Sequence, residues 1–474
     1  MSPNSRKDEL RSQFVGKTLH DVPTPSVVLD LAQIDVNCQR MLETVERLSL
    51  SWRPHIKTHK AGPGKLPENT IELTRLQVGD RGAGPVNLVV STVVEAENVT
   101  PLLKEYQGNG RKVNVLYGIP LSPSTVDRLA HVSSELGPGG LSLMIDHPSQ
   151  LSCVEAIHNK SGNAPLAFMK VDMGYRRAGV IPGTPECLEL VDKLASSAEK
   201  GHCVFRAIYA HAGHSYETRE DWKALDYLAA EFKALEEVAA AVKSRCPGGP
   251  LTLSVGATPT TTSLQHPELN GDQGGTGSSA LDIVNGYLSK LKSAGYDLEV
   301  HAGVYPTLDL QQLATHARDR SLLSASSIGI SIMCEVSSLY PRRGPNQTTE
   351  ALINAGCLAL GREPCADMGE EKGRHYSGWG ILMPWGMANP VPGPDFPAVH
   401  GGWQVGKVSQ EHGILRWCGA PSEEIALQYG QRVRIWPNHA CVAGAGYDNY
   451  LVVDSRREGR EDEVVDVWPR WRGW

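Results

Sequence analysis

Eight short apolar, β-rich runs alternate with helix-like segments between residues 51 and 305, and this alternation constrains the fold more than any other feature of the chain. Near-continuous apolar strands that alternate with helices are typical of a parallel sheet covered by those helices. Eight such units predict an α/β fold with a closed (β/α)8 barrel of the TIM type. A doubly wound open sheet also fits the pattern. The predicted strands are residues 51–57, 87–92, 113–119, 141–146, 165–172, 205–212, 251–257 and 298–305.

The hydrophobic pattern of the sequence changes after about residue 320, where strand-like runs and turns replace helical periodicity. A chain of 474 residues also exceeds what one ordinary core organises. We therefore predict a barrel domain over residues 22–318 and a mainly antiparallel β domain over residues 319–474. Residues 1–21 could pack on either unit. The Thr-, Gly- and Ser-rich residues 259–280 predict a long surface loop.

Composition excludes several classes of partner. The formal charge is -7 and the pI about 6.2, so we expect no nucleic-acid partner. No run of eighteen apolar residues suggests a membrane span, and the first residues lack the apolar core of a secretory signal. The ten cysteines are scattered singly with no CxxC pair, which favours reduced thiols and a cytoplasmic protein.

The first predicted strand ends in RPHIKTHK, which places Lys57 at the mouth of the predicted barrel. His55 and His59 flank it. A lysine near other cationic groups has a lowered pKa and can attack an aldehyde to form a Schiff base. A solvated lysine that closes a strand is the alternative interpretation.

The last two predicted strands end in SVGATPT and HAGVYPT. Both turns combine glycine with hydroxyl side chains at the position where barrels commonly bind phosphate through backbone N–H groups. A phosphate-bearing cofactor opposite a strand-end lysine is the arrangement that pyridoxal phosphate requires. The candidate cofactor contacts in these turns are Gly256, Thr258, Gly303 and Tyr305.

Two further strand ends supply polar side chains. KVDMGYRRAG contains Arg177, whose planar guanidinium suits either the cofactor or a substrate carboxylate. YAHAGHSY contains Tyr209 and Tyr216, together with two histidines. We count both tyrosines as candidate cofactor contacts, and a hydrogen-bonded wall that supports the sheet is an equally good interpretation of each.

A candidate metal pair lies in PNHAC of the second domain. On a strand, His439 and Cys441 would point to the same face because they are two residues apart. Imidazole nitrogen and thiolate sulfur together suit zinc. Two protein ligands are fewer than the three usual at catalytic zinc, so water or substrate would complete the shell. Nothing in the sequence tells whether the nearby SQEHG contributes.

Together, RPHIKTHK, KVDMGYRRAG, YAHAGHSY, SVGATPT, HAG, SQEHG and PNHAC resemble the eukaryotic D-serine dehydratase and D-threonine aldolase family. That family belongs to the fold-type III pyridoxal-phosphate enzymes related to alanine racemase, and the resemblance extends from about residue 22 to 455. It implies a barrel of the alanine racemase N-terminal type, a β domain and a homodimer. One departure is Val304-Tyr305 after HAG, where the family's dehydratases often have Asn-Tyr, so the phosphate contact at residue 304 is open.

The resemblance also implies roles for individual residues. Lys57 corresponds to the Schiff-base lysine, Arg177 to the arginine of the KxDxGxxRxG pattern, and His439 with Cys441 to the metal pair. Cysteine at the second metal position resembles the zinc-dependent D-serine dehydratases, whereas the aldolase branch more often has aspartate there.

The expected reaction is β-elimination of D-serine to pyruvate and ammonia. The cofactor ring delocalises the carbanion, and zinc assists departure of the β-hydroxyl. The freed Lys57 amine removes the α-proton. D-threonine aldolase activity is the nearest alternative, and a pyridoxal-phosphate-binding protein without catalysis is another. Racemisation needs a second base that the sequence does not place.

Overall fold

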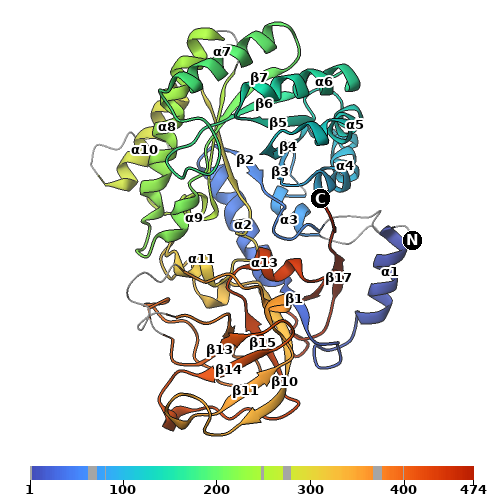
Figure 1. Cartoon of the computed structure of the whole chain (residues 1–474), viewed down its shortest axis with the longest axis vertical. Coiled ribbons are helices and arrows are strands. Elements are labelled where there is room, and N and C mark those ends of the chain that lie inside the picture. Colours follow the sequence, from blue (N-terminus) through green and yellow to red (C-terminus); the bar gives the residue numbers. More distant parts are fainter. Residues whose placement is uncertain are drawn as a thin grey trace.

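The computed structural model describes residues 3–61, 72–80, 82–246, 250–270, 279–366, 376–398 and 400–474. Its upper unit is an eight-stranded parallel sheet in the order β2-β9-β8-β7-β6-β5-β4-β3 (Figure 1). All eight predicted strands are confirmed, with bounds that differ from the predicted ones by at most three residues at either end. The barrel strands are β2 (Ser51–Pro54), β3 (Val86–Val90), β4 (Val113–Pro120), β5 (Leu141–Ile145), β6 (Leu166–Lys170), β7 (Val204–Tyr209), β8 (Thr252–Val255) and β9 (Asp297–Ala302).

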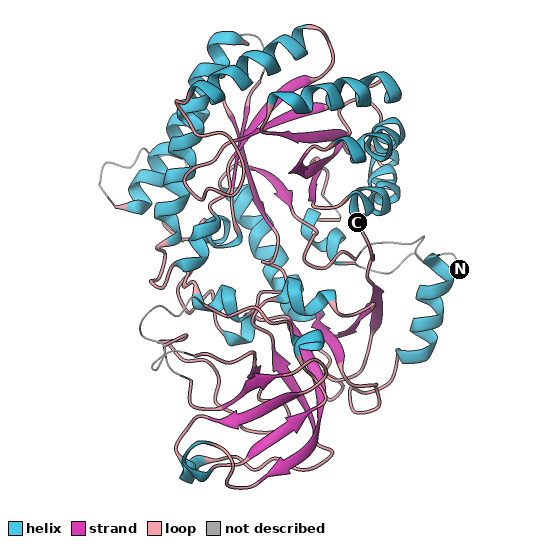
Figure 2. Cartoon of the chain, in the orientation of Figure 1, coloured by secondary structure: helices cyan, strands magenta, loops and turns pink. Residues whose placement is uncertain are grey.

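The sheet closes on itself just beyond β2, which excludes the doubly wound open sheet. His55 forms a parallel bridge with Val89 of β3, and the Ile56 N–H donates to the Val89 carbonyl oxygen at 3.1 Å. Helices surround the strands (Figure 2), as expected for apolar strands whose outer face must be covered. They are α2 (Leu31–Arg47), α3 (Leu73–Val78), α4 (Val93–Gly108), α5 (Val126–Leu136), α6 (Leu151–Ser161), α7 (Pro185–Glu199), α8 (Ala224–Arg245), α9 (Thr258–Ser263) and α10 (Ala280–Ser293).

The barrel interior combines an apolar layer with a buried ion pair. Arg53 Nε lies 2.7 Å from Glu299 Oε1, and the Arg53 Cζ lies 5.0 Å from the centroid of the Phe168 ring. Asn114 and Ser254 complete the hydrogen bonding of this pair. Because both charges are paired and hydrogen-bonded, the interior holds them without an unpaired buried ion. The apolar layer consists of Val89, Leu116, Met144, Phe168, Ala207 and Tyr209.

The lower unit is a nine-stranded sheet in the order β11-β14-β13-β12-β15-β10-β1-β16-β17. Its pairings are antiparallel except β1 with β16, as the predicted mainly antiparallel domain requires. Its strands are β1 (Ser26–Asp30), β10 (Ile330–Tyr340), β11 (Glu350–Ile353), β12 (Ile381–Leu382), β13 (Trp403–Val408), β14 (Gly413–Trp417), β15 (Arg432–Trp436), β16 (Asn449–Val453) and β17 (Asp466–Pro469), and its short helices are α12 (Cys357–Leu360) and α13 (Ala440–Ala445).

The N-terminal part of the chain belongs to this lower sheet. Ser26–Asp30 falls inside the predicted barrel range 22–318, but β1 pairs with β10 and β16, so the predicted range is corrected there. Helix α1 (Pro3–Phe14) contacts β17, and the two run side by side in Figure 1. Leu19 is fully buried in a cluster with residues of β16 and β17. The division near residue 318 remains a prediction.

The predicted surface loop at residues 259–280 is wrong over its first part. Thr258–Ser263 forms helix α9, in which every residue is buried. Pro259 at the start of the helix and hydroxyls that bond to backbone carbonyls allow this Thr-rich segment to fold as a helix. Residues 271–278 of the predicted loop lie outside the described residues.

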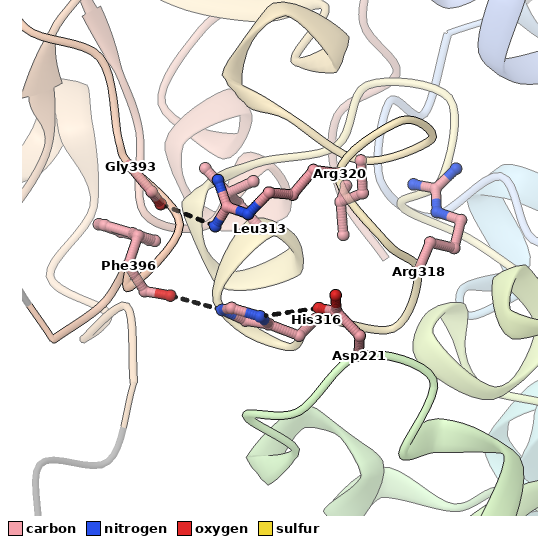
Figure 3. Close-up of a pocket in the computed structure, with 8 residues that line it drawn as sticks. Asp221, Leu313, His316, Arg318, Arg320, Gly393 and Phe396 are labelled. Carbon is pink, nitrogen blue, oxygen red and sulfur yellow. Dashed lines mark hydrogen bonds and ion pairs between the residues drawn. The ribbon is translucent and has the colours of Figure 1, made fainter.

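The two units meet at a segment that follows helix α11 (Leu310–Ala314). His316 lies between Asp221 of the barrel and Phe396 of the β domain (Figure 3). Its Nδ1 is 3.1 Å from the Asp221 carboxylate, and its Nε2 is 2.6 Å from the Phe396 carbonyl oxygen. Arg320 Nη2 donates to the Gly393 carbonyl oxygen at 3.0 Å. These bonds fix the β domain against the barrel.

Two further expectations concern membranes and thiols. In the described part of the chain, none of the helices combines the length and apolar character that crossing a bilayer requires. All ten cysteines are free, as the scattered spacing predicted.

Candidate active site

Lys57 lies just beyond the C-terminal end of β2 and is half-buried. Its backbone N–H donates to Nδ1 of His55 at 3.2 Å, which fixes the turn that carries it. Burial lowers the pKa of His55 far below its ordinary value, and the Lys57 charge adds to this effect. The same charge acts on His211 and on Cys441. Lys57 therefore lies near His211, which follows β7, and near Cys441 of α13, to which the adjacent Thr58 is 3.1 Å away, as expected for a group at the barrel mouth.

The turns after β8 and β9 are joined through Thr258. Its hydroxyl oxygen accepts from the backbone N–H groups of Gly303 at 3.4 Å and Val304 at 3.2 Å. Gly256 has φ +146°, and a Cβ there would lie 2.2 Å from the carbonyl oxygen of His301. The position therefore requires glycine. The structure brings Gly256, Thr258 and Gly303 together, as predicted from the two glycine turns.

Tyr209 and Tyr216 occupy different levels of the mouth. Tyr209 is buried, with its ring stacked on His301 at a centroid distance of 4.0 Å, and Lys170 Nζ lies 4.2 Å from its centroid. Burial lowers the pKa of Lys170 to about 7. Tyr216 is half-buried beside Thr258, and burial together with Cys441 raises the pKa of Tyr216. Tyr216 lies nearer the predicted metal pair, and Tyr209 nearer the barrel interior.

His439 and Cys441 face each other, but from the start of a helix rather than from a strand. His439 is the residue before α13, and Cys441 lies in the first turn. The helix begins there because the buried Asp309 carboxylate accepts the Ala440 N–H at 2.8 Å. Although burial opposes it, the Cys441 charge raises the pKa of His439 to about 9. His439 in turn lowers the pKa of Cys441, which favours a thiolate.

The donor set of this pair fits a metal ion. His439 Nδ1 is buried without a hydrogen-bond partner, since Glu363 Oε1 lies 3.8 Å away. An unpaired imidazole nitrogen beside a thiolate is a soft two-ligand site. In the part of the chain that the structure describes, no group of three or more His, Cys, Asp or Glu side chains could hold a metal. Water or a substrate oxygen would have to complete the shell.

Two predicted residues are not brought into this group. Arg177 is exposed, with its Cζ 5.3 Å from the Tyr175 ring centroid, although its charge lowers the pKa of Lys170 and His211. Tyr305 is buried in contact with Trp52 at a centroid distance of 5.4 Å. Its hydroxyl faces Cys38 of α2, which covers the outside of the barrel. The predicted contact of Tyr305 with the cofactor is therefore corrected, because its side chain points to the helical layer.

Three polar residues at the site were not predicted. Thr58 Oγ1 lies 3.1 Å from Cys441 Sγ, and Asp309 holds the turn that carries both metal candidates. Glu231 on α8 is fully buried and accepts backbone N–H groups from the turns after β7 and β8. The sequence carried a signal for Glu231, which is a charged residue on the apolar face of its helix. It is three residues after Leu228 and four before Leu235, the spacing of one helix face.

Comparisons with known proteins agree with this architecture. Residues 29–277 match the model of the alanine racemase N-terminal domain, and residues 329–453 match that of a putative serine dehydratase domain. The chain is 33% identical to the D-serine dehydratase of Schizosaccharomyces pombe, with 99% of this chain and 97% of that protein covered. It is 32% identical to the D-serine dehydratase of Saccharomyces cerevisiae, with 98% and 100% covered.

A solved structure is similar over the whole chain. D-threo-3-hydroxyaspartate dehydratase from Delftia sp. HT23 is 25% identical with a TM-score of 0.69, and the match covers 97% of this chain and 100% of that one. Structures of the same enzyme include a histidine-to-alanine variant and a cysteine-to-alanine variant in the metal-free form.

Proposed function

This chain belongs to the D-serine dehydratase family of alanine-racemase-like enzymes, and we propose that it converts D-serine to pyruvate and ammonia. The observation that carries the proposal is the meeting of Lys57, the joined glycine turns and the His439–Cys441 pair at one barrel mouth. A strand-end amine and hydroxyl-rich glycine turns fit pyridoxal phosphate, and a thiolate–imidazole pair fits zinc.

We propose that Lys57 Nζ holds the aldehyde carbon of pyridoxal phosphate, and that Gly256, Thr258 and Gly303 lie around its phosphate. When bound, this cofactor supplies an electron sink for the carbanion that deprotonation of Cα creates. Lys57 Nζ would be the base that takes the α-proton of the substrate. Burial lowers the pKa of His55, so this imidazole stays neutral beside Lys57, and its Nδ1 accepts the backbone N–H that fixes the turn. Tyr209 forms the floor of the site through its stack with His301.

His439 and Cys441 would hold the zinc ion, which supplies a Lewis acid for departure of the β-hydroxyl. Two observations support this assignment: the unpaired Nδ1 of His439 and the lowered pKa of Cys441. Tyr216 lies within reach of both Thr258 and Cys441 and would orient the substrate between the cofactor and the metal. Arg177, exposed at the rim, would attract the substrate carboxylate.

The decisive experiment incubates the purified protein with D-serine, D-threonine and D-threo-3-hydroxyaspartate, with and without a chelator. Keto acid, ammonia and aldehyde are measured in parallel. We expect pyruvate and ammonia from D-serine, and loss of both products after metal removal. Glycine and acetaldehyde from D-threonine as the main products would instead identify an aldolase. Keto acid formation that is indifferent to the chelator would refute the metal's role.

We also propose a cytoplasmic homodimer. The ten free cysteines suit a reducing compartment, and Leu358 and Val442, which are exposed on α12 and α13 next to the predicted metal pair, suit a covered apolar contact. Sedimentation equilibrium measures the assembly directly, and a monomer at micromolar concentration would contradict it.

A further inference from the structure

Glu231 of helix α8 ties together two of the turns that form the barrel mouth. Its carboxylate oxygen Oε1 accepts the Ala212 N–H at 2.9 Å and the Gly256 N–H at 3.0 Å. Ala212 belongs to the turn after β7 and Gly256 to the turn after β8. A single oxygen therefore sets the spacing of two strand ends. It does so from helix α8, outside the barrel, where the Glu231 side chain is fully shielded from solvent.

The carbonyl group of Gly256 is also hydrogen-bonded to a side chain. His211 Nδ1 lies 2.7 Å from the Gly256 carbonyl oxygen, so both polar groups of this glycine are bonded to side chains. Two residues later, Thr258 accepts from the turn after β9. A shift at Gly256 would thus be transmitted to Thr258 and to the Gly303 turn. Glu231 lies at the start of this series of contacts.

A buried carboxylate is a costly way to satisfy two backbone donors. Its second oxygen, Oε2, is buried without a hydrogen bond of good geometry, and the Thr260 hydroxyl and the charge of Lys170 offset the burial of the carboxylate only in part. Transfer of such a group from water costs stability that its hydrogen bonds offset only in part. A side chain that served only to fill the layer between α8 and the sheet would be better apolar, as Leu228 and Leu235 beside it are.

We propose that Glu231 is a positioning residue of the cofactor site: it holds Ala212 and Gly256 so that His211 and Thr258 keep the places that seat pyridoxal phosphate opposite Lys57. This inference rests on the proposed function. Glu231 reaches these turns from helix α8 of the outer layer, through the backbone N–H groups of Ala212 and Gly256 and the Thr260 hydroxyl of α9, and is therefore not assigned a contact with the cofactor.

Two substitutions of Glu231 distinguish the role of its hydrogen-bond acceptor from the role of its negative charge. Glu231→Gln keeps an acceptor oxygen of the same reach, whereas Glu231→Met keeps the length and removes the acceptor. Glu236→Met is the matched control, because Glu236 lies on the same helix in a partly exposed ion pair with Lys290. Each apo-protein is titrated with pyridoxal phosphate by absorbance, and kcat and KM for D-serine are measured at saturating cofactor. Circular dichroism and urea midpoints report on folding.

We expect Glu231→Met to raise the cofactor dissociation constant about 10-fold or more and to lower kcat, because two buried N–H donors lose their acceptor. KM for D-serine should stay within about twofold, since the substrate is bound by other groups. Glu231→Gln and Glu236→Met should bind the cofactor as the wild type does. If Glu231→Met does not fold, Glu231→Asp, which withdraws the carboxylate by one methylene, must show the same weakening.

A cofactor dissociation constant unchanged in Glu231→Met, or in Glu231→Asp when that variant replaces it, would overturn the inference whatever happens to the urea midpoint. Failure of the proposed function is distinguishable from this result, since a wild-type protein that binds no pyridoxal phosphate would reject the cofactor itself.

Discussion

Thr58 Oγ1 lies 3.1 Å from Cys441 Sγ, which joins the residue after Lys57 to a side chain 383 positions later in the other unit. The contact links the predicted cofactor lysine to the predicted metal cysteine through one hydroxyl. It also explains part of the lowered pKa of Cys441, because a hydroxyl that donates to sulfur favours the thiolate.

The contact leads to a prediction for Thr58→Val, which removes the hydroxyl at nearly constant volume. We expect zinc affinity to fall about 10-fold, as is common when a group that orients a metal ligand is lost. Thr58→Ser keeps the hydroxyl and should keep the affinity. Competition with a chromophoric chelator measures the dissociation constant, and equal values for the two variants would show that the hydroxyl does not orient Cys441.

Lys57→Ala should abolish both D-serine turnover and the visible absorbance of enzyme-bound pyridoxal phosphate. The physical reason is that the proposal assigns to the Lys57 amine both the bond to the cofactor aldehyde and the removal of the α-proton. Lys57→Arg keeps the positive charge without a reactive amine and serves as the control. Turnover in either variant would reject the assignment of Lys57.

Cys441→Ala should retain cofactor absorbance, because Lys57 is untouched, but lose bound zinc and dehydration. Inductively coupled plasma mass spectrometry gives the metal content of the purified protein. Cys418→Ala, at an exposed cysteine of the β domain, is the control and should change neither quantity. Full D-serine turnover by zinc-free Cys441→Ala would remove the metal from the mechanism.

Gly256→Ala should destabilise the protein by several kcal/mol, because its Cβ would lie 2.2 Å from a carbonyl oxygen at φ +146°. Gly110→Ala is the control: its φ is also positive, at +83°, but nothing lies within 4 Å of the added Cβ. It should cost only about 1 kcal/mol, the price of the backbone conformation. Urea unfolding measures both, and equal losses would mean that the turn at Gly256 relaxes freely.

Glu231→Gln should alter the pH dependence of stability between pH 4.5 and about 7. Burial raises the pKa of Glu231 from 4.5 to about 7, so the folded state binds more protons than the unfolded state within this window. Stability conferred by the protonated carboxyl is complete below pH 4.5 and is lost as the pH rises through 7, by at most about 3 kcal/mol.

The nearby Lys170 is distinguishable by sign and window, because burial lowers its pKa from 10.5 to about 7. Its contribution is present above pH 10.5 and is lost as the pH falls through 7. The urea midpoint of the wild type minus that of Glu231→Gln should therefore decline from pH 4.5 to 7. A difference that does not vary with pH would show that Glu231 has the same pKa in both states.

Much of the fold could be predicted because its signals are local. The eight barrel strands are apolar runs of four to eight residues, and the period of the hydrophobic pattern marks them without knowledge of their partners. Lys57 and the glycine turns could be placed together from the sequence because each follows a barrel strand. The C-terminal ends of all strands of one barrel lie at the same rim.

Other features depend on contacts between distant residues and carried no local signal. Strand β1 joins the lower sheet only through β10 and β16, and PNHAC is helical because Asp309 accepts a backbone N–H there. Tyr305 points to helix α2 rather than to the mouth, since its ring packs on Trp52.

The sequence by itself determined the positions of the strands, which polar residues follow each strand at the barrel rim, and the residue types suited to a cofactor and a metal. These features depend on spacing along the chain. Only the tertiary structure decided which side chains meet. The contacts of Thr58 with Cys441 and of Glu231 with Ala212 and Gly256 join segments that are distant along the chain, and packing and buried hydrogen bonds select them after the local elements have formed.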